Sequence, residues 1–169
     1  MQEAILVDID GTAAIMNDRK PYDYDKVGND SINFPVWETI SALEKAKGYK
    51  IVFASGRMNV EFPGRCERKD KSYRRGYMPG DDTEYPTCFD LTLAWLSKYC
   101  KLYDMEVNPA LFMREQDDNR QDSIVEKELY QGQISKLYDI KFVIDDRQQV
   151  VDMWRSLGLV CFQVAEGNF

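Results

Sequence analysis

Five short apolar runs, separated by stretches with helical periodicity, constrain the fold of this chain more than any other feature. Each run is short enough to be a strand, and the polar turns around it are typical of strands buried on both faces. The runs are Ala4–Val7, Lys50–Ala54, Ala110–Met113, Ile140–Ile144 and Leu159–Val164. Strands that alternate with helices are typical of a parallel sheet with helices on both faces. The sequence therefore predicts an α/β fold of this kind.

Apolar residues recur at helical spacing between these runs. Val36, Ile40 and Leu43 form the first such face, and Gly48 marks its end. The other three faces are Leu91, Ala94 and Trp95; Ile124, Val125 and Leu129, with Ile134 and Leu137 beyond; and Val150, Val151, Trp154 and Leu157, before Gly158. We expect a helix at each of these faces.

Two longer polar segments interrupt the alternation. Residues 17–33 follow the first predicted strand, and residues 58–86 follow the second and contain three prolines and three glycines. Long loops at the carboxyl edge of a sheet are more often lids or substrate contacts than spacers. At 169 residues the chain is long enough for one domain with a sizeable core. We expect a single domain over residues 1–169, with a small insertion or cap at about 58–86.

The first strand ends in two carboxylates. Asp8 and Asp10 follow it directly, with Gly11 after them, so both acids lie at the edge where open α/β sheets bind ligands. Two carboxylates this close cannot both stay ionised in a dry site unless a cation neutralises them; otherwise one holds a proton. Both outcomes favour phosphate chemistry with Mg²⁺. The alternative is an acidic turn that caps a helix.

Further polar signals follow the later strands. Ser55, Gly56 and Arg57 close the second strand and combine a hydroxyl, an approachable backbone and a guanidinium, which together suit an oxyanion. The alternative is a turn with an incidental arginine. Asp145 and Asp146 close the fourth strand, where adjacent acids favour Mg²⁺ ligation over a simple helix N-cap.

A helix with a charged start precedes that last acid pair. Asp122 stands at its beginning and Lys127 follows within the next turns. A lysine near this helix start could hold phosphoryl oxygens, although a solvated lysine is the commoner case.

Composition excludes several classes of function. Histidine is absent, which rules out Ser-His and Cys-His nucleophilic machinery and His-ligated metals. The net charge of −7, from 22 basic and 29 acidic residues, disfavours wrapping a nucleic-acid backbone but allows a grip on one strand end. The four cysteines form no CxxC pair, so a zinc site is not expected. Without a membrane-length apolar run or a leader, we expect a soluble cytoplasmic protein with no membrane partner.

The order of these motifs is more specific than any one of them. An acid pair, Ser-Gly-Arg, a lysine on a helix and a second acid pair resemble the haloacid-dehalogenase (HAD) superfamily of Mg²⁺-dependent phosphotransferases. The chain is most similar to the 3′-phosphatase domain of bacteriophage polynucleotide kinase/phosphatase. This closer resemblance is carried by residues 8–12, 16–23, 113–114, 117–122, 144–155 and 163–169. It covers nearly the whole chain and is poor only in residues 58–86.

The resemblance implies a Rossmann-like, HAD-like fold and a Mg²⁺-dependent activity. That family removes 3′-phosphates, including 2′,3′-cyclic ones, from DNA or RNA ends through an aspartyl-phosphate. Carried over residue by residue, it implies Asp8 as nucleophile, Asp10 as acid/base, Arg19 and Arg57 as phosphate contacts, Asp122 as a supporting residue, and Asp145 and Asp146 with Asp8 and the Asp10 carbonyl at the metal. Proximity to Asp8 is expected to raise the pKa of Asp10 when no metal is bound.

One departure concerns the catalytic lysine. The family has it in a Val-Val-Lys-Glu-like run, whereas here the run is Ile124-Val125-Glu126-Lys127, with the charges exchanged. A shift of one residue turns a side chain by about 100° around a helix. Lys127 remains the candidate, provided that the helix start adjusts.

A second departure concerns the kinase. No GxxxxGK[ST] loop occurs in the chain, so we expect a lone phosphatase or an excised domain. A homo-oligomer and a separate kinase or ligase are left open as partners.

The insertion suggests how a substrate is chosen. Residues 65–75 contain six basic and two acidic residues, with Tyr73 inside and Tyr77 just beyond. Positive charge interleaved with aromatic rings suits a single nucleic-acid strand. The alternative is a solvated loop whose charge is balanced by residues 81–84. Two other functions also stay open: a HAD phosphatase for a small-molecule phosphate, and a non-catalytic HAD-fold binding protein.

Overall fold

A five-stranded parallel sheet forms the centre of the protein, seen here in a computed structural model that describes residues 1–62 and 76–167. The strand order is β5-β4-β1-β6-β7. The strands are β1 (Gln2–Asp8), β4 (Lys50–Met58), β5 (Ala110–Arg114), β6 (Tyr138–Arg147) and β7 (Cys161–Gly167). Each of the five apolar runs lies in one of them, save the first residues of the last run, and the predicted α/β class is confirmed.

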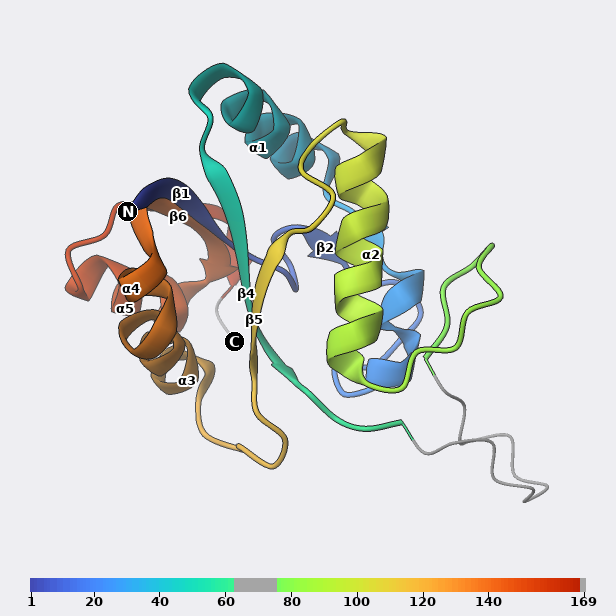
Figure 1. Ribbon diagram of the computed structural model, residues 1–169. Coiled ribbons are helices and arrows are strands. Elements are labelled where there is room, and N and C mark those ends of the chain that lie inside the picture. The colour runs from blue at the N-terminus through green and yellow to red at the C-terminus, as the bar shows by residue number, and fades with distance from the viewer. Residues whose placement is uncertain (63–75, 168–169) are drawn as a thin grey trace.

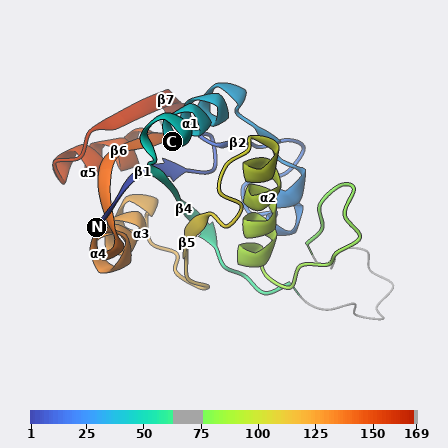
Figure 2. The same cartoon turned by 45° about the horizontal axis from the view of Figure 1, so that its top comes forward.

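Helices cover both faces of this sheet (Figure 1). On one face lie α1 (Phe34–Lys47) and α2 (Cys88–Leu102), as Figure 2 shows from a second direction. On the other lie α3 (Asp122–Leu129), α4 (Ser135–Leu137) and α5 (Gln148–Ser156). The π-helical segment η2 (Tyr130–Ile134) joins α3 to α4. The four predicted helical faces fall in these elements, except that Leu157 follows the last residue of α5. Gly48 after α1 takes the left-handed conformation (φ 69°).

The alternation of side chains along β1 separates two apolar cores. Ile5 and Val7 face α1 and α2, where Trp37 and Trp95 pack edge to face with ring centroids 6.0 Å apart. Leu6 faces the other side, together with Trp154 of α5. A strand buried on both faces reads as a continuous apolar run, which is why β1 shows no polar alternation.

The segment predicted as a polar loop, residues 17–33, is more ordered than expected. It contains the 3₁₀ helix η1 (Tyr24–Asn29) and the strand β3 (Ser31–Ile32), which pairs antiparallel with β2 (Ala14–Ile15). The loop prediction is therefore wrong for this part. Val27 of η1 is fully buried in the core beside α2, and one apolar residue among polar neighbours carries no periodicity that a sequence pattern can reveal.

Only the ends of the predicted insertion belong to the described residues. Beyond β4, Glu61 bridges to Thr87 and Gly76 to Tyr85, so the two flanks of the insertion run beside each other. The basic stretch from Arg65 to Arg75 lies outside the described residues, with Tyr73 and Cys66.

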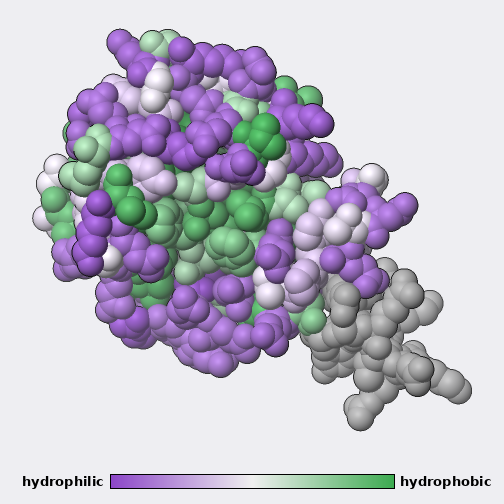
Figure 3. Space-filling model, in the orientation of Figure 1, coloured by the Kyte–Doolittle hydropathy of each residue, from purple (hydrophilic) through white to green (hydrophobic). Residues whose placement is uncertain are grey.

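The surface agrees with this arrangement. Apolar side chains gather in the middle of the face in Figure 3, over β4 and β5, and hydrophilic side chains surround them. Within residues 1–62 and 76–167 no helix is both long and apolar enough to cross a membrane.

The strand order creates a switch point between β1 and β6. The chain proceeds from β1 to β4 and β5 on one side, and then returns to place β6 and β7 on the other. In open α/β sheets, ligands bind outside the carboxyl ends of the strands at such a point. Asp8 ends β1, and Asp145 lies near the end of β6, so the fold brings both to this position.

Trp37 connects the core to the loop that follows β1, because its indole N–H donates to the Ala13 carbonyl at 2.9 Å. We predict that Trp37→Phe lowers the free energy of unfolding by about 2 kcal/mol through the lost hydrogen bond and ring volume. Urea unfolding measures this. Phe34→Leu on the exposed start of the same helix is the control and should change stability little. Equal effects of the two substitutions would contradict a stabilising role for the Trp37 side chain.

Candidate active site

Three carboxylates converge at the switch point. Oxygen atoms of Asp8, Asp145 and Asp146 lie within 4.8 Å of one another, and Asp145 and Asp146 are 1% and 4% exposed. The turn after β1 allows this approach at Gly11 (φ 88°), since a Cβ there would overlap the Asp146 carboxylate. The structure thus brings together three of the four predicted metal-site residues.

Hydrogen bonds fix the orientation of two of these acids. Asp145 accepts from the Trp154 indole N–H and from the Arg147 backbone N–H, both at 3.0 Å. Asp146 accepts from the Thr12 hydroxyl at 3.3 Å. Donors placed behind a carboxylate in this way orient it for a ligand on its free side.

Burial and mutual repulsion make these acids hard to ionise together. Burial, followed by the charges of Asp145 and Glu126, raises the pKa of Asp8 well above its usual range. Burial raises the pKa of Asp145 to about 7, against the opposing effect of the Trp154 hydrogen bond, and burial also raises the pKa of Asp146. A compact set of carboxylate oxygens fits a hard divalent cation such as Mg²⁺, which would replace the bound protons.

Two arginines bind the side chain of Asp10, which is not part of the carboxylate cluster. The guanidinium of Arg57 donates to both Asp10 oxygens at 2.7 and 2.8 Å, and that of Arg19 donates to one of them at 2.8 Å. Both arginines also bond to Asp30, at distances between 2.6 and 3.0 Å. The Arg19 and Arg57 side chains are 2% and 1% exposed, so these ion pairs are largely shielded from water.

The expected rise in the pKa of Asp10 is wrong. Burial acts to raise that pKa, but the charges and hydrogen bonds of Arg57 and Arg19 outweigh it and lower the pKa of Asp10. The side chain of Asp10 also lies outside the compact carboxylate group among the described residues. Only its backbone carbonyl is left for the predicted role at the metal.

Ser55, Gly56 and Arg57 lie in the last part of β4, and Gly56 lies beside Asp122. Ser55 is 1% exposed and accepts from the Arg57 backbone N–H at 3.2 Å. At Gly56 a Cβ would come within 2.9 Å of an Asp122 oxygen, so glycine permits that approach. Asp122 itself bridges two guanidinium groups, those of Arg114 and Arg147.

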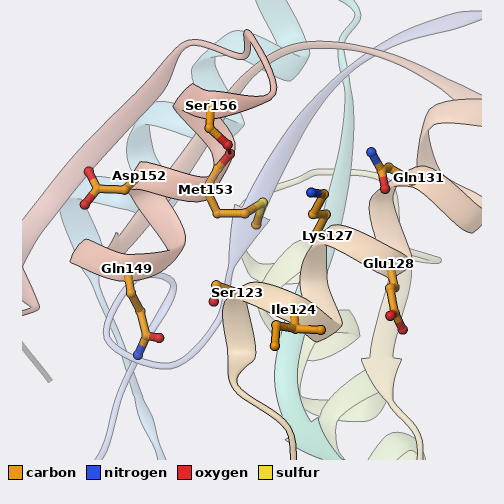
Figure 4. Close-up of a pocket in the computed structure, with 9 residues that line it drawn as sticks. All are labelled: Ser123, Ile124, Lys127, Glu128, Gln131, Gln149, Asp152, Met153 and Ser156. Carbon is orange, nitrogen blue, oxygen red and sulfur yellow. Dashed lines mark hydrogen bonds between the residues drawn. The ribbon is translucent and has the colours of Figure 1, made fainter.

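The structure does not bring Lys127 to the carboxylates. It is exposed and lines a hollow of about 570 Å³ between α3 and α5, with Met153 and Ser156 across from it (Figure 4). Its neighbour Glu126 is buried instead. Burial, with Asp145 and then Asp146 acting in the same direction and Arg114 against them, raises the pKa of Glu126 well above its usual range.

Sequence reasoning missed several residues of this site. Asp30 lies in a segment without periodicity, and Arg114 and Arg147 looked like ordinary charged residues at strand ends. Glu126 had one available signal, since it follows Asp122 by four residues and so shares its helix face. That spacing could have placed Glu126, rather than Lys127, toward the sheet.

Comparison with known proteins identifies the family. A family model described as "Polynucleotide kinase PNKP phosphatase domain" matches residues 2–79 and 79–169. The chain belongs to this family. The HAD-like fold and the resemblance to polynucleotide phosphatases, both predicted from sequence, are confirmed.

Relatives of this PNKP phosphatase domain are longer proteins. One, from Autographa californica nuclear polyhedrosis virus, is named "Putative bifunctional polynucleotide kinase/RNA ligase"; it is 29% identical over 155 residues, covering 91% of this chain and 18% of its own length. Two similar solved structures are described as "Structure of the Pnkp1/Rnl/Hen1 RNA repair complex" and "Structure of Pnkp1/Rnl/Hen1 complex". Each has a TM-score of 0.74 and 34% identity, and they cover 99% and 100% of this chain. This chain spans 44% and 48% of the matched chains.

We predict that the metal-free domain becomes less stable as the pH rises from 5 to 8. A carboxyl group whose pKa rises from its usual 3.8 to about 7 on folding, as for Asp145, binds more protons folded than unfolded. Its stabilisation is complete below pH 3.8 and lost as the pH approaches 7. Thermal unfolding in EDTA should show a decrease on the order of 5 °C.

Two further measurements check that pH effect. Asp145→Asn should make the decrease in EDTA smaller, because it removes one of the buried acids with a raised pKa. Mg²⁺ should restore stability at pH 8 more than at pH 5, because the cation takes the place of the proton. A melting temperature in EDTA that rises from pH 5 to pH 8 would contradict a raised pKa for Asp145.

We also predict that Trp154→Phe weakens metal binding. The substitution keeps most of the ring but removes the N–H that orients Asp145. Affinity for Mn²⁺, measured by calorimetry, should fall on the order of tenfold. Phe34→Leu, an exposed change at the start of α1, serves as the control and should leave the affinity unchanged.

Proposed function

We propose that this domain is a Mg²⁺-dependent polynucleotide 3′-phosphatase that works through an aspartyl-phosphate. The observation that carries the proposal is the compact group of Asp8, Asp145 and Asp146 at the switch point of a HAD-like sheet. Asp8, Asp145, Asp146 and the Asp10 carbonyl would hold Mg²⁺, which when bound supplies positive charge that screens these acids and the phosphoryl oxygens.

In this mechanism Asp8 is the nucleophile. A carboxylate oxygen of Asp8 attacks the phosphorus in line, the bond from phosphorus to the 3′ oxygen breaks, and that oxygen takes a proton from Asp10. Asp10 then accepts a proton from a water molecule. The resulting hydroxide attacks the phosphorus, inorganic phosphate leaves, and Asp8 is restored.

The position of Asp10 adds a condition to this scheme. With Arg19 and Arg57 bonded to it, Asp10 is ionised and cannot act as an acid. Phosphoryl oxygens compete for the same guanidinium groups, because arginine binds phosphate as well as carboxylate. Transfer of the two arginines to the substrate removes what lowers the pKa of Asp10, and burial then favours its protonated form. Substrate binding would thus prepare the acid.

Ser55, Gly56 and Asp122 complete the proposed phosphate site. The backbone at Gly56 approaches the site without a side chain, and Asp122 holds Arg114 and Arg147 in place beside it. Arg147 in turn donates its backbone N–H to Asp145. Asp122 therefore supports the site through the residues around it rather than by touching substrate.

The substrate proposal, a 3′-phosphorylated RNA or DNA end, rests on the family and on the names of the relatives, which refer to polynucleotide kinase, RNA ligase and RNA repair. The same names support a kinase or ligase as a working partner. Location in the cytoplasm and a homo-oligomeric state stay predictions from sequence.

We predict that Asp8→Asn lowers Mg²⁺-dependent phosphate release by roughly 10³-fold or more, because the variant keeps the size of the nucleophile but not its reactivity. Release is measured on 3′-phosphorylated, 5′-phosphorylated and 2′,3′-cyclic oligonucleotides, with sugar phosphates in parallel. Glu128→Gln, an exposed change on α3, is the control. Faster turnover of sugar phosphates than of every oligonucleotide would replace the proposal with a small-molecule phosphatase.

One observation favours a second candidate, a non-catalytic HAD-fold protein that binds a partner. A buried Glu126 near the proposed phosphate site adds negative charge where a substrate phosphate would enter, which opposes both binding and turnover of that phosphate. In that case the chain releases no phosphate from any oligonucleotide or sugar phosphate with any divalent cation. The same screen, run with Mg²⁺ and with Mn²⁺, separates the two functions.

A further inference from the structure

Glu126 is a buried acid with a carboxylate oxygen that accepts no hydrogen bond among the described residues. It lies on α3, is 3% exposed, and its Oε2 atom is without a hydrogen-bond partner in the described part of the chain. An unpaired buried carboxylate oxygen is costly, so natural proteins rarely keep one without a ligand or a structural reason. Arg114 does not pair with it through Nε, since that atom also lacks a partner among residues 1–62 and 76–167.

Glu126 faces the carboxylate cluster. Its electrostatic neighbours are the acids Asp145, Asp146 and Asp10 and one base, Arg114, which opposes them. Its own charge acts in turn on Asp8. It nevertheless lies outside the compact group of Asp8, Asp145 and Asp146, whose oxygens are all within 4.8 Å of one another. Glu126 is therefore close enough to share the field of that group but too far to close around the same cation.

The charges of the described residues leave this region strongly negative. Arg19 and Arg57 are neutralised by Asp10 and Asp30, and Arg114 and Arg147 exceed Asp122 by one positive charge. Against that single positive charge stand four acids: Asp8, Glu126, Asp145 and Asp146. When all four acids are ionised, one divalent cation therefore still leaves a net charge of minus one, before a phosphoryl dianion enters.

We propose that Glu126 holds a second divalent cation beside the one held by Asp8, Asp145 and Asp146. Mg²⁺ is usually bound by one or two carboxylates together with substrate phosphate and water, rather than by a complete protein cage. Glu126, one neighbouring aspartate and a phosphoryl oxygen would make such a site. The second cation would neutralise the excess charge and draw the phosphoryl group toward Asp8.

The inference rests on the proposed function only for its phosphoryl ligand, and its test does not depend on turnover. Metal-free chain is titrated with Mn²⁺ at pH 8, with and without methylphosphonate as a non-hydrolysable phosphoryl group, and bound Mn²⁺ is counted by electron paramagnetic resonance. We expect two Mn²⁺ per chain with methylphosphonate, and a spectrum broadened by two neighbouring ions. One Mn²⁺ under both conditions overturns the proposal, whatever the phosphatase assay shows.

Variants locate the second ion. Glu126→Gln and Glu126→Lys should each reduce the count from two to one, and the broadening should disappear. Glu128→Gln makes the same carboxylate-to-amide change on the exposed face of α3, so it should keep two ions. Two ions in the Glu126 variants would show that Glu126 does not hold the second ion, which would overturn the proposal. Because the wild-type count needs no substitution, the test stands even if a Glu126 variant fails to fold.

Discussion

The crowding of buried carboxylates at the carboxyl ends of β1 and β6 is the constraint on which the rest of the site depends. Asp8, Asp145 and Asp146 are held within one small volume by the register of two paired strands. Their repulsion can be relieved only by protons or by cations. The hydrogen bonds from Trp154 and Thr12 orient the acids, and by opposing protonation they favour cations.

A second constraint separates the two aspartates after β1. They are two residues apart in sequence, yet Asp8 belongs to the carboxylate cluster with Asp145 and Asp146, while Asp10 belongs to an arginine cluster completed by Asp30. Their environments move their pKa values in opposite directions. In the metal-free protein this difference is opposite to what the proposed roles need, because Asp8 must be ionised to attack phosphorus and Asp10 must hold a proton. A cation at Asp8 and transfer of the arginines from Asp10 to phosphate would reverse both shifts.

The start of α3 decides the electrostatic character of the phosphate site. Asp122 pairs with two arginines, and Glu126 stands one turn further on the same side, while Lys127 faces the hollow beside α5. Relative to the family pattern, the helix therefore presents a carboxylate where an ammonium group was expected. In the proposed phosphate site, cations would supply positive charge that Arg19 and Arg57 alone do not replace, which would link the chemistry of the domain to its metal content.

The sequence by itself determined the strands, the helices and the acids at the strand ends, because each depends on a local pattern: an apolar run, a helical period, or a carboxylate directly after a buried strand. Only the tertiary structure decided which of the charged residues meet. Asp30, Arg114 and Glu126 reach the site through packing between segments distant in sequence. The lowered pKa of Asp10 depends on its distances to Arg19 and Arg57, which no periodicity encodes.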